Sequence, residues 1–174
     1  MASLKVAPSG IERTFPEDEF IVSKTDLKGR ITYVNEVFCK VAHYTEQEAL
    51  GKPHSLVRHP DMPRCVFKLL WDTLESGNEI FAYVVNMAKD GAHYWVFAHV
   101  TPTFDNNGTI IGYHSNRRKP RQEAVNAVSG LYRTLIEIEN KHSDRKEGMN
   151  AALNTVVNLM KDKGTTYEEF VLTL

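Results

Sequence analysis

Side chains suited to binding chemistry gather in one irregular segment, residues 51–63. The segment holds His54, Arg58, His59 and Asp61, together with three prolines and a glycine. Prolines at this density exclude a regular helix or a central strand. Arg58 and His59 can neutralise phosphate groups, and Asp61 can orient Arg58 or cap a following helix. We therefore expect this segment to form one wall of a pocket, because irregular segments on a rigid scaffold commonly carry binding sites.

The residues before this segment predict a hairpin and two short helices. Residues 19–24 and 31–34 are rich in β-branched and aromatic side chains and flank a turn that contains glycine, which predicts two paired strands. Asn35 is suited to cap a helix over the residues that follow it. Residues 45–48 form a capping-box pattern that opens a second short helix.

The residues after the segment predict a longer helix and the rest of a sheet. Pro63 suits the first turn of a helix whose apolar stripe ends near residue 76. Residues 80–88, 94–103 and 109–115 predict three strands joined by tight turns. The whole order predicts an α+β fold: a five-stranded antiparallel sheet with short helices on one face.

A helical extension is predicted to follow the sheet. Apolar residues recur at helical spacing from about residue 120, with a polar break at residues 141–148 and a capping-box pattern at Thr166. The chain is thus expected to divide into an arm (1–14, loose to about residue 10), an α+β domain (15–119) and the extension (120–174). The extension cannot bury its apolar faces alone, so it should pack on the sheet, on itself, or on another copy of the chain in a homodimer.

Composition narrows the class of protein. The 174 residues carry a net charge of −1, which gives no reason to expect nucleic acid as a partner. No window is long and apolar enough for membrane insertion, and Cys39 and Cys65 lack the spacing of a metal or disulfide motif. We expect a cytoplasmic protein with reduced thiols. No nucleophile–base pairing or metal cluster points to an enzyme.

Several stretches together resemble one known family. They are Thr25-Asp26-Leu27, the run from Val57 to Pro63, His93-Tyr94-Trp95-Val96, and Gly112-Tyr113. Over residues 15–120 the chain resembles the flavin-binding PAS domains of the aerotaxis-receptor type. The resemblance implies a cytoplasmic module that holds FAD non-covalently and reports its redox state to a chemotaxis-type or other signalling protein.

The resemblance gives roles to residues on both sides of the expected pocket. Asn86, on a predicted strand, can donate and accept hydrogen bonds at the edge of a flavin ring, and Phe67, Trp71 and Trp95 are candidate walls. Strand alternation sends Tyr94 and Trp95 to opposite faces, and the sequence leaves open which of these faces is inside. The candidate cofactor-binding residues are Asn35, His54, Arg58, His59, Asp61, Phe67, Trp71, Asn86, Tyr94 and Trp95.

Other interpretations remain beside these. His59 can be a hydrogen-bonded turn residue, Asp61 a helix cap, and Phe67 and Trp71 ordinary core residues. A PAS domain that binds haem b would need an axial histidine, for which the candidates are His54, His59, His99 and His114. A cofactor-free dimerisation or scaffold module is a third possibility. The basic run at residues 117–121 is expected to be a solvated junction between sheet and helix, or a route for a signal out of the sheet.

Overall fold

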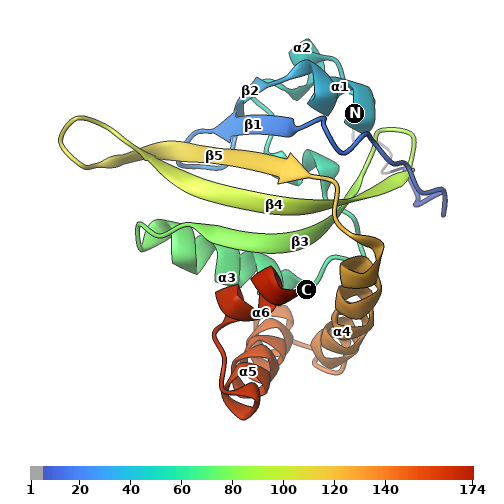
Figure 1. Ribbon diagram of the computed structural model, residues 1–174, viewed down its shortest axis with the longest axis vertical. Coiled ribbons are helices and arrows are strands. Elements are labelled where there is room, and N and C mark those ends of the chain that lie inside the picture. Colours follow the sequence, from blue (N-terminus) through green and yellow to red (C-terminus); the bar gives the residue numbers. More distant parts are fainter. Residues whose placement is uncertain (1–5) are drawn as a thin grey trace.

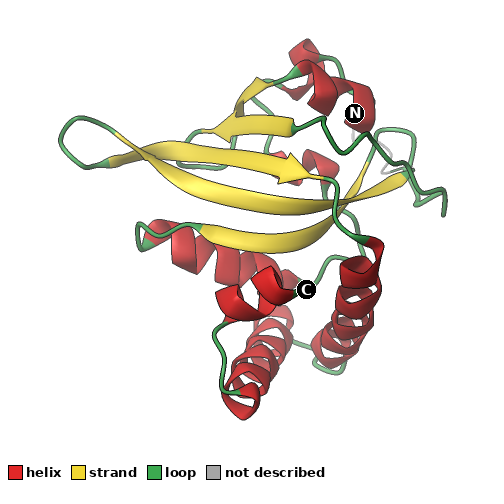
Figure 2. Cartoon of the chain, in the orientation of Figure 1, coloured by secondary structure: helices red, strands yellow, loops and turns green. Residues whose placement is uncertain are grey.

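A single antiparallel sheet runs through the middle of the protein. The computed structural model describes residues 6–174. Five strands pair in the order β2-β1-β5-β4-β3, and every neighbouring pair is antiparallel (Figures 1 and 2). The strands are β1 (Ile21–Thr25), β2 (Ile31–Val34), β3 (Ile80–Met87), β4 (His93–Phe104) and β5 (Ile110–Arg118). The predicted fold class is confirmed.

Short helices between β2 and β3 cover one face of this sheet, which we call the inner face. They are α1 (Glu36–Ala42), α2 (Glu46–Ala49), the 3-10 turn η1 (His54–Val57) and α3 (Arg64–Glu75). Two of the predicted caps are confirmed in these helices: the Asn35 side chain accepts a hydrogen bond from the Phe38 N–H at 3.0 Å, and Thr45 and Glu48 form a capping box.

Strand β4 shows which side chains face the helices. Tyr94, Val96, Ala98 and Val100 are buried against the inner face, and the residues between them point to the other side of the sheet. The predicted alternation of Tyr94 and Trp95 is therefore correct, and the structure places Tyr94 inside.

The C-terminal extension forms three helices on the β3 side of the molecule (Figure 1). They are α4 (Gln122–Asn140), α5 (Arg145–Lys163) and α6 (Tyr167–Thr173). Helices α4 and α5 form a hairpin, and a Cβ on Gly148 would lie only 2.3 Å from the carbonyl oxygen of Glu139, so this crossing requires glycine. The predicted break at 141–148 was too long, because Asp144 caps α5 and the helix begins at Arg145.

The apolar stripes of the extension are covered within the same chain. Val128, Leu135 and Val156 are buried in the common core, and the Tyr132 hydroxyl donates a 2.5 Å hydrogen bond to the carbonyl of Tyr83 on β3. The extension thus packs on itself and on the sheet, two of the three predicted arrangements. This packing removes the reason given for a homodimer, which stays a prediction.

The described part of the N-terminal arm is held against the sheet, whereas a loose arm was predicted up to about residue 10. Ser9 donates a backbone hydrogen bond to Gly91 at 2.9 Å, and Arg13 donates one to His93 at 2.7 Å. Residues 9–13 therefore lie along the start of β4 and are not a loose arm. Residues 1–5, also predicted to belong to this arm, lie outside the described residues.

Candidate functional site

A cavity of about 300 Å³ lies between the inner face of the sheet and helix α3. Leu70 and Leu74 of α3 form one apolar wall, and Val84 and Val100 of the sheet form the opposite wall. Ala98, on β4, faces the cavity between them, and its small side chain leaves space that a larger residue would fill. The lining residues are Ser23, Thr25, Lys28, Gly29, Pro53, His54, Ser55, Arg58, Phe67, Leu70, Trp71, Leu74, Val84, Asn86, Ala98, Val100, Tyr113, Ser115 and Arg117.

Several polar groups of the lining have no hydrogen-bond partner in the part of the chain that the structure describes. Asn86 is 4% exposed, and its side-chain nitrogen has no hydrogen-bond partner among the described residues. The same holds for the hydroxyl of Thr25 and for two nitrogens of Arg117. Buried polar groups are nearly always satisfied, so a cavity with several unsatisfied donors is suited to a ligand that supplies acceptors.

His54 joins the cavity wall to the first strand. Its Nε2 lies 3.0 Å from the hydroxyl oxygen of Ser23, which also accepts a hydrogen bond from Arg117. Burial, and then the nearby charge of Arg117, lower the pKa of His54 from 6.5 to about 3. The ring is therefore neutral at physiological pH and shares a hydrogen bond with the Ser23 hydroxyl.

This neutral histidine predicts a pH dependence of stability. The unfolded chain binds a proton at His54 below about pH 6.5, whereas the folded chain does not until about pH 3. The contribution of the neutral His54 to the free energy of unfolding is therefore fully present above pH 6.5. It falls by up to about 1.4 kcal/mol per pH unit as the pH drops from 6.5 toward 3. His54→Gln should make that slope shallower by the share that His54 contributes, measured by urea unfolding at several pH values between 7 and 4. The exposed His142 gives a control, His142→Gln, and parallel curves for the wild type and both variants would contradict the burial of a neutral His54.

Arg58 and two aromatic residues shape another part of the cavity. The guanidinium of Arg58 lies over the Phe67 ring, 4.4 Å from its centroid, and burial lowers the pKa of Arg58. The Trp71 ring meets Tyr113 edge to face at 5.3 Å and lies against Gly29. Lys28, beside this glycine, is exposed and adds a further cation to the lining.

The structure brings together five of the ten predicted site residues. His54, Arg58, Phe67, Trp71 and Asn86 all line the cavity. They come from η1, the residue that follows it, α3 and β3, and Arg58 also forms an antiparallel backbone bridge with Asn86.

His59 and Asp61 lie elsewhere. Both line a second hollow of about 520 Å³, which they share with His93 and with residues of the arm and α4. Arg58 is extended, and successive side chains of an extended chain point to opposite sides, so His59 points away from the cavity that Arg58 lines. Asp61 is exposed and does not cap α3, contrary to that interpretation.

Asn35, Tyr94 and Trp95 also lie outside the cavity lining. The side chain of Asn35 is used as the cap of α1. Tyr94 is fully buried in the core. Trp95 points to the other face of the sheet, where its ring stacks on Tyr132 of α4 at 6.1 Å.

The cap of α3 comes from the helical extension. Glu139 on α4 is 4% exposed and accepts hydrogen bonds from the Cys65 backbone N–H at 2.8 Å and from the Arg64 side chain at 2.9 Å. A carboxylate at a helix N-terminus satisfies a free N–H group and is favoured by the helix dipole. This residue couples the extension to the helix that lines the cavity.

Seven polar or aromatic members of the lining were not predicted as site residues: Ser23, Thr25, Lys28, Ser55, Tyr113, Ser115 and Arg117. Arg117 was assigned to a solvated basic run, yet it is 2% exposed. Alternation in β5 carries a signal for it, because Tyr113, Ser115 and Arg117 share one face of the strand.

Comparison with known proteins places this arrangement in a family. The family described as "PAS fold" matches residues 31–117, half of the 174-residue chain. The chain belongs to the PAS family. The chain is 43% identical over 119 residues to the aerotaxis receptor of Escherichia coli, covering 68% of this chain and 23% of that protein. It is 29% identical over 97 residues to the nitrogen fixation regulatory protein of Klebsiella pneumoniae, covering 56% of this chain and 20% of that one.

Solved structures agree with the PAS assignment. A PAS domain from Colwellia psychrerythraea superposes with a TM-score of 0.54 at 20% identity, covering 58% of this chain and 86% of that chain. A light-oxygen-voltage domain studied with a flavin analogue superposes with a TM-score of 0.56 at 21% identity, covering 71% and 87%. These likenesses concern the fold.

The chain spans about a quarter or less of the curated relatives named above. Within residues 6–174, no helix is both long and apolar enough to cross a membrane. In the same range, no group of three or more His, Cys, Asp or Glu side chains could hold a metal ion.

Proposed function

We propose that the protein is a cytoplasmic redox sensor that binds FAD non-covalently in the cavity and passes the redox state of the flavin to a signalling protein. The proposal excludes catalytic turnover of a substrate. It rests above all on the buried amide nitrogen of Asn86, which lines the cavity and has no hydrogen-bond partner among the described residues. The similarity to an aerotaxis receptor supports it.

The cavity has the parts that a flavin requires. A planar aromatic ring needs apolar walls, which Leu70, Leu74 and Val84 provide, and a few polar groups that fix its orientation. Asn86 can both donate to and accept from the polar edge of the ring. Arg58 and Lys28 supply positive charge for the phosphates.

A bound flavin would supply reversible redox chemistry, and the chain's own residues would transmit the change. Helix α3 carries Phe67 and Trp71 to the cavity, and its first turn is held by Glu139 of the extension. A shift of α3 that follows a change in the cavity would therefore alter the packing of α4 and α5, which could present a different surface to a partner.

A haem cofactor fits the cavity less well. Of the four histidines considered as axial ligands, His54 lies in the lining, and its Nε2 is engaged by Ser23 at 3.0 Å. His99 is paired with Glu79 at 2.6 Å, outside the lining. A cofactor-free scaffold leaves the orphaned donors of the cavity unexplained.

The visible spectrum of the purified protein distinguishes these functions. We expect the two broad absorption bands of a bound flavin, and release of FAD on denaturation, identified by chromatography against FMN. A sharp Soret band would instead mean haem. A colourless folded protein that also fails to take up added FAD would contradict the proposed function.

A further inference from the structure

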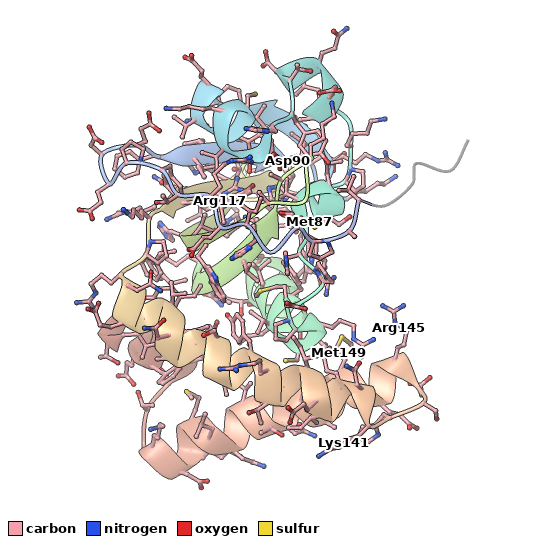
Figure 3. All side chains as sticks on the ribbon, turned by 90° about the vertical axis from the view of Figure 1, so that its right-hand side faces the viewer. Met87, Asp90, Arg117, Lys141, Arg145 and Met149 are labelled. Atoms are coloured by element: carbon pink, nitrogen blue, oxygen red, sulfur yellow. The ribbon has the colours of Figure 1, made fainter. Side chains whose placement is uncertain are left out.

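Arg117 is a buried cation that lacks an anionic partner. Its guanidinium donates one hydrogen bond, to the Ser23 hydroxyl, and lies over the Phe38 ring at 5.6 Å. Its Nε and Nη1 atoms have no acceptor within residues 6–174. No Asp or Glu of the same range forms an ion pair with it. In Figure 3, Arg117 lies in the middle of the molecule, whereas Lys141 and Arg145 lie at the turn between α4 and α5.

This charge cannot be removed by proton loss at neutral pH. Burial lowers the pKa of Arg117 to about 10, which still leaves the guanidinium protonated. Burying an unpaired charge costs several kcal/mol, and replacing buried charges with apolar side chains of similar volume is often neutral or stabilising. An arginine in this position therefore costs stability in the protein alone, and a ligand that neutralises it would recover that cost.

The groups around Arg117 do not neutralise it. Burial raises the pKa of Tyr94, and the pKa of His54 is lowered to about 3, so both side chains are uncharged at pH 7. The cavity lining contains Lys28, Arg58 and Arg117 and no acidic residue. The charged side chains of the lining are therefore all positive, and Arg117 is the most deeply buried of them.

The cations lie in two different environments. Lys28 is exposed and Arg58 is partly exposed, so both would suit ligand phosphates held near solvent. Arg117 is on the central part of the sheet, where β5 pairs it with Ala98 of β4, and both line the cavity. Whatever ring occupies the space above Ala98 lies within reach of the Arg117 side chain.

We propose that Arg117 is the counter-ion for negative charge on the buried ring of the ligand, and so favours the reduced over the oxidised flavin. This inference rests on the proposed function. The oxidised ring is neutral, and two electrons with one proton convert it to an anion; an external donor, dithionite in the assay below, supplies the electrons. Arg117 pairs with the added charge and thereby raises the midpoint potential of the bound flavin.

The test compares Arg117→Gln and Arg117→Lys with the wild-type full chain, each loaded with FAD. In Arg117→Gln the preference for the reduced flavin should fall by roughly tenfold to hundredfold, which lowers the midpoint potential by about 30–60 mV for a two-electron couple. Arg117→Lys keeps the charge and should retain most of the potential. The matched control is Arg58→Gln, which should weaken FAD binding in both redox states alike and leave the potential nearly unchanged.

A second readout does not depend on flavin. In flavin-free protein, Arg117→Met should unfold at a higher urea concentration than the wild type, because it removes an unpaired buried charge. Loss of stability in this variant would assign Arg117 a structural role and overturn the inference. A wild type that binds no FAD overturns the proposed function. A flavin-loaded Arg117→Gln with the wild-type potential overturns the Arg117 assignment alone.

Discussion

Replacing Ala98 with phenylalanine should abolish FAD binding and leave the fold intact. The Ala98 side chain points into the 300 Å³ cavity, and a phenyl ring there would occupy the space assigned to the flavin. In a filled core, such an insertion costs roughly 1–3 kcal/mol of stability. Here the cavity accepts the ring, so the flavin-free variant should unfold within about 1 kcal/mol of the wild type. Its dissociation constant for FAD should rise by at least roughly a hundredfold.

The matched control lies three residues along the same strand. Thr101 is on the opposite face of β4, so Thr101→Phe adds the same ring without entering the cavity. This variant should bind FAD like the wild type, as measured by flavin fluorescence in an equilibrium titration. Ala98→Phe that binds FAD normally would show that the ligand site lies elsewhere. A large loss of stability in Ala98→Phe would show that the cavity is smaller than the structure indicates.

Glu139→Ala should cause a large loss of stability although the residue lies outside the cavity. The carboxylate accepts hydrogen bonds from the Cys65 N–H and from the Arg64 guanidinium, and it is almost completely buried. Its removal leaves the first turn of α3 uncapped and Arg64 unpaired, and we expect a loss of about 3 kcal/mol in the free energy of unfolding. Glu139→Gln should lose less, because the amide oxygen can still accept from Cys65. Urea denaturation measures both.

The neighbouring Glu137 is the control for this effect. It lies on the same helix and is exposed, so Glu137→Ala should change stability by less than about 0.5 kcal/mol. If Glu139 also transmits the state of the cavity, Glu139→Ala should increase amide hydrogen exchange in α4 and α5 and make it insensitive to reduction of the bound flavin. Equal stability losses for the two glutamates would remove Glu139 from this role.

The fold could be predicted from local patterns because strong local signals agree with the tertiary structure. Capping residues such as Asn35 and Thr45, the glycine turns and the alternation in β4 each specify an element independently of its neighbours. The predicted ends of helices and strands were less accurate where a tertiary contact determines them. Helix α5 begins at Arg145 because Asp144 caps it there. The helix continues through Gly148, whose lack of a side chain allows close packing on Glu139.

The site was only partly predictable, because strand and loop geometry decides which side chains converge. Arg58 and His59 are adjacent in sequence, yet they line different hollows. Tyr94 and Trp95 could not both line one cavity, and neither lies in the lining. Arg117 was not predicted to be buried, because it belongs to a basic run whose composition is typical of solvated surface. Its burial follows from the strand continuing to residue 118, beyond the predicted end at 115.

The central claim is that this cavity holds a flavin, and titration of FAD into flavin-free wild-type protein tests it most directly. The account predicts saturable binding of one FAD per chain with quenching of flavin fluorescence, in the full chain whose fold is verified by circular dichroism. Absence of saturable binding by correctly folded protein would contradict the account.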